Sequence, residues 1–187
     1  QKAVKEKPQD AGLLAQLAYS YLQRKSNAQA RRYALAAREI EEQHQLAAYV
    51  LARLYLSIGD VEQALEILEA NLDEDAPQEN LLSLLAGLKL KSKDFAESIR
   101  LYELGAKQHP NNSKWIKALA RAYLLTKDDD RLATTLTQLA ELDGDDFLVR
   151  KKLSQLALNR NAFQESVRWA NLALHVNVMD ADTHATL

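Results

Sequence analysis

The 187-residue sequence contains no cysteine, only three prolines and only five glycines. Without cysteine, the chain can form neither a disulfide framework nor a cysteine-ligated metal or iron–sulfur site, and it has no thiol nucleophile. The scarcity of proline and glycine excludes collagen-like and low-complexity linker sequences. Apolar residues make up 47% and charged residues 27%, a balance typical of a folded, helix-rich chain rather than a disordered one.

Two further absences concern nucleic acids and membranes. The net charge of −2 gives no overall attraction to nucleic acid or to an anionic membrane, so such a partner would need a local basic patch. The longest mostly apolar run, from Leu81 to Leu90, is far shorter than the roughly 20 residues that span a bilayer. We therefore expect no membrane-spanning segment and no membrane partner.

Motifs that carry catalysis or hold a cofactor are also missing. The sequence has no glycine-rich phosphate loop, no zinc-binding helix with paired histidines and no nucleophile turn. Its histidines lack metal-ligand spacing, and we interpret them as surface or turn residues: His44, His109, His175 and His184. Two aspartate-rich runs, 128–130 and 143–146, lack the ligand pattern of a calcium loop and are explained by helix capping. We expect no enzyme activity, no cofactor and no metal.

The sequence does contain an internal repeat of 34 residues. The repeats are 11–44, 45–78, 79–112, 113–146 and 147–180, without insertions, and partial repeats cover 1–10 and 181–187. The seventh column always holds leucine: Leu17, Leu51, Leu85, Leu119, Leu153 and Leu187. The eighth column holds a small residue: Ala18, Ala52, Ala86, Ala120 and Ser154. Fixed columns at a constant period are typical of a repeat architecture.

Each repeat predicts two helices joined by a short turn. In the second repeat, apolar residues recur at helical spacing over 48–55 and again over 64–72. Between these segments Gly59 tolerates a positive φ, and Asp60 can cap the helix that follows. The same two columns are occupied by Lys93-Asp94 and Lys127-Asp128. Because one helical hairpin cannot bury its apolar faces alone, neighbouring hairpins are expected to stack into a solenoid.

The period and the columns resemble those of the tetratricopeptide repeat. Residues that match its pattern are Tyr21, Tyr55 and Tyr123; Ala30 and Ala64, with Ser98 and Ser166 as small substitutes; and Tyr102, Ala37, Ala173 and Pro110. The resemblance implies an all-α fold, a right-handed superhelical solenoid of antiparallel helix pairs, as a single array over residues 1–187. Leu132 and Leu139 are larger than the family's residues in their columns, so we expect altered packing angles in the fourth repeat.

The residues outside the five repeats fit the same frame. Ala3 and Pro8 fall at the late alanine and proline columns of a preceding repeat, and 181–187 begins another first helix. We therefore expect the sequence to be a section of a longer array, with at least one more repeat on each side. Such a section would expose apolar surface at its C-terminal end, so self-association through uncapped ends is expected.

The resemblance also implies where a ligand binds. In this family, columns 2, 5, 9, 12 and 13 line a concave groove formed by the stacked first helices. Across the five repeats these columns hold six basic residues and no acid. Lys114, Lys117 and Arg121 share one helix face, while Tyr19 and Tyr49 offer flat amphipathic contacts. The predicted peptide-binding residues are Tyr19, Tyr49, Arg53, Lys91, Lys114, Lys117, Arg121 and Lys151.

The predicted function is a non-catalytic protein–protein interaction scaffold that binds a peptide segment, which the basic groove predicts to be acidic. Single-stranded RNA is an alternative ligand, disfavoured because recurring base-reading pairs and a strongly basic domain are absent. Another alternative is an accessory array of a larger enzyme or secretion assembly. The clamp with which some family members hold chaperone tails is not matched, since Ala15, Tyr49 and Ser83 stand in the column of its first lysine.

Overall fold

The computed structural model describes residues 10–142 and 146–186. The sequence predictions for Ala3, Pro8, Asp143, Asp145 and Leu187 lie outside these residues. All regular secondary structure in the described part of the chain is helical. By internal contacts the chain divides into two units, 1–101 and 102–187, and the boundary falls inside one helix, α7 (Phe95–Gln108).

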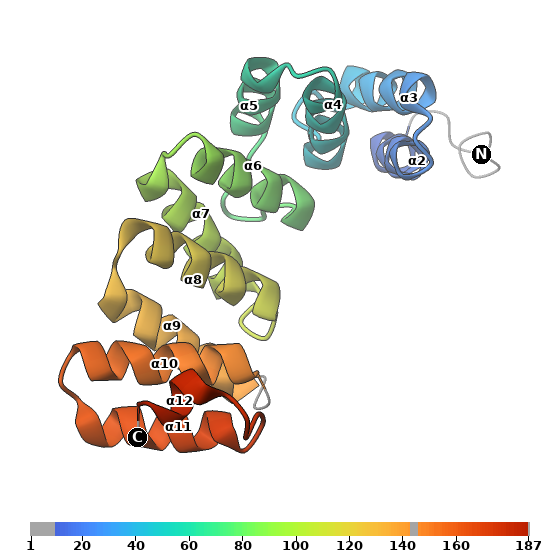
Figure 1. Cartoon of the computed structure of the whole chain (residues 1–187). Helices are drawn as coiled ribbons and strands as arrows, with labels where there is room; N and C mark the ends of the chain where they lie inside the picture. Colours follow the sequence, from blue (N-terminus) through green and yellow to red (C-terminus); the bar gives the residue numbers. More distant parts are fainter. Residues whose placement is uncertain (1–9, 143–145, 187) are drawn as a thin grey trace. The chain divides into compact units, whose positions relative to one another are not determined.

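The first unit consists of two stacked helical hairpins and the start of a third. Its helices, labelled in Figure 1, are α2 (Ala11–Gln23), α3 (Asn27–Ile40), α4 (Gln45–Ser57), α5 (Val61–Ala70), α6 (Glu79–Lys91) and the first half of α7. Helix α2 packs against α3 and α4, and α4 packs against α5 and α6. Each of these first helices therefore contacts its own hairpin partner and the first helix of the next hairpin, as stacking predicts.

The second unit continues the succession of helical hairpins. After the end of α7 it contains α8 (Ser113–Thr126), α9 (Asp129–Leu142), α10 (Phe147–Asn159), α11 (Phe163–Leu174) and the short α12 (Ala181–His184). Successive helices from α8 to α12 pack against each other, and short connections make them antiparallel. The predicted fold class, an all-α stack of antiparallel helix pairs, is confirmed.

The last column of each repeat caps the first helix of the next repeat. At six consecutive occurrences of this column, a side-chain atom accepts a hydrogen bond from a backbone N–H in the first helical turn: Asp10, His44, Gln78, Asn112, Asp146 and Asp180. The caps are of four residue types, aspartate, histidine, glutamine and asparagine. Each has a side-chain acceptor atom that can reach the unpaired backbone N–H groups at the start of a helix. Helices α2, α4, α6, α8, α10 and α12 consequently begin at the same column of the repeat.

The turn inside each hairpin has one residue in the left-handed conformation. Its φ is positive in all five repeats: Lys25 (58°), Gly59 (82°), Lys93 (64°), Lys127 (58°) and Asn161 (59°). The next column holds an aspartate that accepts a backbone hydrogen bond in three repeats: Asp60, Asp94 and Asp128. Ser26 and Ala162, at the same column, make no such side-chain bond. The predicted turn is confirmed, with lysine and asparagine taking a conformation that costs them more than it costs glycine.

Small residues bring the two helices of a hairpin together. Ser98 lies fully buried on α7 and donates to the carbonyl oxygen of Ala86 on α6 (2.9 Å), and Ser166 on α11 donates likewise to Ser154 on α10 (3.0 Å). A serine at this column thus satisfies its hydroxyl without leaving the core. Leu132 and Leu139, the large residues of the fourth repeat, are also buried, each with 2% of its surface exposed.

Candidate functional site

In the first unit, three of the predicted binding residues lie together on α2 and α4. The ring centroids of Tyr19 and Tyr49 are 6.1 Å apart, and Arg53 donates to the Tyr49 hydroxyl (3.1 Å) with its guanidinium 5.9 Å from that ring's centroid. Tyr49 is only 6% exposed, so its ring mainly packs, whereas Arg53 is exposed. A ligand here would meet a guanidinium supported by an aromatic ring. Lys91 lies exposed at the end of α6 and forms no ion pair with any described residue.

In the second unit, three predicted basic residues lie on α8. Lys114, Lys117 and Arg121 are all exposed, and none forms an ion pair in the part of the chain that the structure describes. Leu124 and Leu125 follow on the same helix and are each 51% exposed. The spacing i, i+3, i+7, i+10 and i+11 places all five side chains on one side of the helix. We call these five residues the α8 stripe, a row of cations that ends in apolar side chains.

Lys151, the remaining predicted residue, is already neutralised by the protein itself. Its ammonium lies 2.9 Å from a carboxylate oxygen of Asp180 and 2.9 Å from one of Asp182, so it joins α10 to the start of α12. Hydrogen bonds from Lys151 and Thr183 lower the pKa of Asp180 to about 2, and the two carboxylates raise the pKa of Lys151. Asp182 stands in column 2 of the partial sixth repeat, which the count over five repeats did not include.

Two of the histidines and two acids of the run 128–130 have partners within the chain. No group of three or more histidine, aspartate and glutamate residues within 10–142 and 146–186 is arranged to hold a metal ion. His44 caps α4, and His184 Nε2 lies 2.8 Å from the carbonyl oxygen of Val178. In the run 128–130, Asp128 caps α9 and Asp130 pairs with Arg160 at 3.1 Å.

No helix among the described residues is both long enough and apolar enough to cross a membrane.

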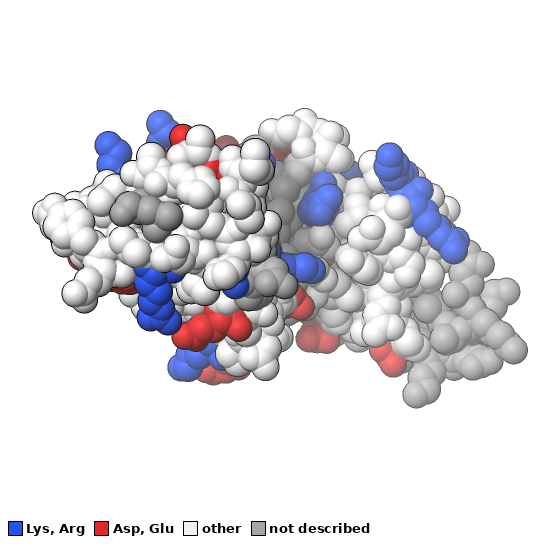
Figure 2. All heavy atoms as spheres, turned by 60° about the horizontal axis from the view of Figure 1, so that its bottom comes forward, with Lys and Arg blue, Asp and Glu red and all other residues white. Residues whose placement is uncertain are grey.

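On the face drawn in Figure 2, lysine and arginine side chains are separated by uncharged surface and by aspartate and glutamate. Ion pairs within the units account for several basic residues: Lys89 with Glu69, Arg100 with Glu74 and Glu97, and Arg131 with Asp128. The cations without such partners, including those of the α8 stripe, are therefore the ones available to a ligand.

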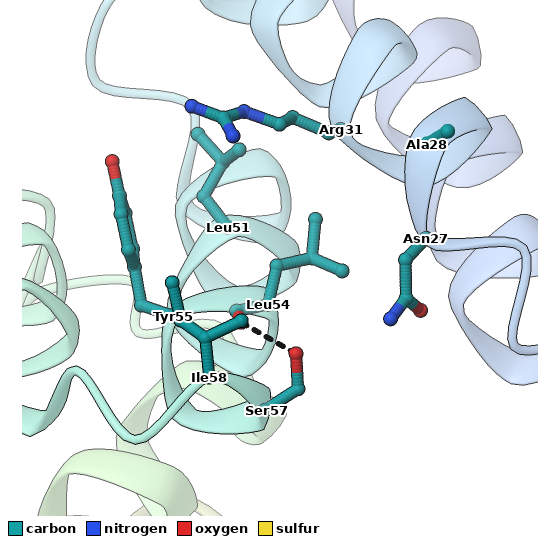
Figure 3. Close-up of a pocket in the computed structure, with 8 residues that line it drawn as sticks. All are labelled: Asn27, Ala28, Arg31, Leu51, Leu54, Tyr55, Ser57 and Ile58. Carbon is teal, nitrogen blue, oxygen red and sulfur yellow. Dashed lines mark hydrogen bonds between the residues drawn. The ribbon is translucent and has the colours of Figure 1, made fainter.

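An apolar pocket between α3 and α4 was not predicted from the sequence (Figure 3). Its volume is about 340 Å³, and it is lined by Asn27, Ala28, Arg31, Leu51, Leu54, Tyr55, Ser57 and Ile58. Leu51 is buried (4% exposed) and Ile58 is exposed (76%), so the pocket leads from the core to the surface. The sequence signal that could have revealed it is Arg31, which stands in a column that holds Leu65, Ile99 and Val167 in other repeats.

These features together define a helical-hairpin repeat protein with exposed basic side chains that form no ion pair among the described residues. Residues 47–79 match the family model of the tetratricopeptide repeat. This match confirms the resemblance to the tetratricopeptide repeat that the columns predicted. No curated protein sequence matches the chain.

Solved structures of tetratricopeptide type share this fold. YrrB, described as a TPR protein with an unusual peptide-binding site, superposes with a TM-score of 0.73 at 14% identity and covers 98% of this chain and 95% of its own. PilF of Pseudomonas aeruginosa gives 0.65 at 18% identity, covering 94% and 80%. MamA from Desulfovibrio magneticus RS-1, from residue 41 to its end, gives 0.65 at 15% identity, covering 91% and 97%. At these identities the similarity establishes the fold alone.

Proposed function

We propose that the chain is a non-catalytic protein-interaction scaffold and that the α8 stripe binds an acidic peptide segment. The observation that carries the proposal is a row of three exposed cations, without anionic partners among the described residues, that leads into two half-exposed leucines. Like charges one helical turn apart destabilise a helix by a few tenths of a kcal/mol per pair, and an anionic ligand removes that cost. The leucines fit apolar side chains of the same segment.

A peptide as the ligand class is supported by the similarity to YrrB, which is described as having a peptide-binding site. In the first unit, Tyr19, Tyr49, Arg53 and Lys91 are proposed as further contacts, with Arg53 as the main charged group because Tyr49 is mostly buried. Lys151 is proposed as a minor contact, since two carboxylates of the chain compete for its ammonium. Opposite charges accelerate the encounter, and apolar contacts then slow dissociation.

The proposal is tested with the double substitution Lys117→Glu and Arg121→Glu. The probe is a fluorescein-labelled peptide of alternating glutamate and leucine, and binding is measured by fluorescence anisotropy at low salt. We expect the affinity to fall roughly tenfold or more, because two attractive charges become repulsive. The matched control is Lys107→Glu with Arg168→Glu, which changes the net charge equally at exposed positions of α7 and α11 in the same unit.

Equal affinities for the stripe variant and the control variant would contradict the proposal. Circular dichroism of both variants verifies that the helices remain. Tight binding of a single-stranded RNA with a steep salt dependence, in place of the peptide, would favour the RNA alternative.

A further inference from the structure

A second cationic region lies in the first unit and plays no part in the proposed function. Residues 21–38 contain five basic residues and no acid: Arg24, Lys25, Arg31, Arg32 and Arg38. The first four are exposed, and none of the five forms an ion pair with any residue of 10–142 or 146–186. Arg38 donates only to the backbone carbonyl of Glu42 (2.8 Å). The turn before α3 and helix α3 therefore carry excess positive charge, with Glu39 near the end of α3 as the one acid of the helix.

The apolar pocket between α3 and α4 borders this cationic region. Arg31 belongs to both, and in Figure 3 it extends from α3 over Leu51 toward the ring of Tyr55. In the same view Leu54 on α4 points toward Asn27 and Ala28 on α3, and Ile58, which follows the end of α4, lies beside Tyr55. Small-molecule binding sites have volumes of about 300–1,000 Å³. The pocket, at about 340 Å³, is at the low end of this range and has room for one large side chain or a pair of them.

The first repeat has polar residues in two pocket columns that hold apolar residues in later repeats. The column of Arg31 holds Leu65 in the second repeat and Ile99 in the third, and Ile99 is only 8% exposed. The column of Asn27 holds Phe95 in the third repeat. In the first repeat both positions are polar, and the residue between them in space, Ala28, is too small to fill the gap.

The equivalent junction between α5 and α6 in the same unit carries opposite charges in two columns of the repeat. There Lys89 on α6 forms an ion pair with Glu69 on α5. The same two columns at the α3–α4 junction hold Tyr55 and Leu35, which cannot form an ion pair, and Leu35 remains 44% exposed. The α3–α4 junction thus combines open apolar surface with excess positive charge.

We propose that this pocket docks an acidic protein segment, which inserts one large apolar side chain, leucine or phenylalanine, and places its carboxylates against Arg31 and the basic residues around it. Charge complementarity selects this occupant, because residues 21–38 hold five cations and no anion, and 21–42 still carries a net charge of +2 (five cations less Glu39, Glu41 and Glu42). The concave shape suits a single inserted side chain, whereas an anionic bilayer requires a protruding apolar face. The site is separate from the α8 stripe and does not depend on it.

The probe is the peptide Asp-Glu-Leu-Phe-Glu-Asp, labelled with fluorescein, and binding to the full chain is measured by anisotropy. Ala28→Leu fills the pocket and should weaken binding roughly tenfold, the usual effect of blocking an apolar side chain from its pocket. Its matched control, Gln29→Leu, adds the same side chain to the next residue of α3, which is exposed and does not line the pocket, and should leave affinity unchanged. Arg31→Glu should weaken binding by a similar factor, and Lys107→Glu should not.

A second approach does not depend on filling the pocket. Ile58 is 76% exposed at the rim, so Ile58→Asp leaves the core intact and should also reduce affinity. In amide NMR spectra, the unlabelled peptide should shift resonances of Ala28, Leu54 and Ile58.

Several outcomes would overturn the proposal. One is an unchanged affinity of folded Ala28→Leu and Ile58→Asp variants for the peptide. Another is retained binding of a peptide in which serines replace the leucine and phenylalanine. The third is that the peptide shifts only resonances of α8. Binding to phosphatidylglycerol vesicles that Arg31→Glu abolishes, without peptide binding, would assign the surface to a membrane instead. All these affinities are measured in the Lys117→Glu, Arg121→Glu background, which removes the α8 stripe as a second site for this acidic peptide. Loss of all binding in that background would contradict the proposed location.

Discussion

Gly105 on α7 lies so close to the indole of Trp115 on α8 that a Cβ at this glycine would be 2.3 Å from Cε3 of the ring. Trp115 is only 3% exposed and meets Tyr102 edge-on, with ring centroids 6.3 Å apart. Its Nε1 is buried without a hydrogen-bond partner among the described residues. Packing alone therefore holds this ring, and the missing side chain of Gly105 makes room for it.

Gly105→Ala should lower the free energy of unfolding by about 1–3 kcal/mol, because the new methyl group displaces a buried ring. The loss is expected even though alanine is the better helix former by about 1 kcal/mol. Urea denaturation measures the effect. Gly12→Ala is the matched control, since its Cβ would meet only Asp10 Oδ1, at 3.3 Å; it should be neutral or stabilising. Adding Trp115→Leu to Gly105→Ala should recover part of the loss, and strict additivity of the two substitutions would contradict this account.

Lys93→Gly should stabilise the protein by about 1 kcal/mol, because lysine at a φ of 64° carries a steric cost that glycine avoids. Lys91→Gly, two residues earlier in ordinary helix, should have the opposite effect, since glycine weakens helices. Thermal and urea unfolding of the two variants provide the comparison. A destabilised Lys93→Gly variant would show that the left-handed turn residue bears no strain.

Ala162→Asp should stabilise the protein by about 1 kcal/mol, because it supplies the side-chain cap that α11 lacks. Asp60 performs this function at the same column in the second repeat, where it accepts from the backbone N–H of Gln63 (3.1 Å). Asp60→Ala should therefore cost a similar amount. If Asp60→Ala is costly and Ala162→Asp brings no gain, the two turns are not equivalent.

Tyr123 should make stability fall at high pH. Burial and the hydrogen bond that its hydroxyl donates to Glu103 (2.8 Å) raise its pKa from 10.0 to about 12. Because the folded pKa lies above the unfolded one, this contribution is complete below about pH 10 and is lost as the pH rises toward 12. The loss should amount to no more than about 3 kcal/mol. Urea unfolding between about pH 9 and pH 12 measures it, and Tyr123→Phe should have a flatter profile than the unmodified chain. Identical profiles would contradict the assignment.

The repeat frame allowed the turns to be predicted from one repeat to the next. Gly59 suggests a left-handed conformation because glycine favours it. The 34-residue period extends this prediction to Lys93 and Lys127, although a lysine by itself does not indicate a positive φ. The structure adds Lys25 and Asn161 at the same column. Backbone geometry follows the period because each hairpin must reverse direction after a helix of nearly the same length.

The partners of individual side chains could not be predicted in this way. Tyr19, Tyr49 and Arg53 share a groove in the column pattern, but only the structure shows that Arg53 is bonded to Tyr49. Lys151 looked like an available groove cation, yet its carboxylate partners come from the next, partial repeat. The α3–α4 pocket was missed because Asn27 and Arg31 stand outside the columns that the resemblance assigns to the groove.

The helix caps set limits on how these repeats can be recombined. His44 ends one 34-residue repeat in sequence but completes the first helix of the next, so a hairpin excised from residue 45 onward would start with an unprotected terminus. The portable module therefore runs from one cap to the residue before the next, for example 44–77. A graft joined one residue too late would lose about 1 kcal/mol at its leading helix, and its stability would depend on whichever side chain its upstream neighbour supplied.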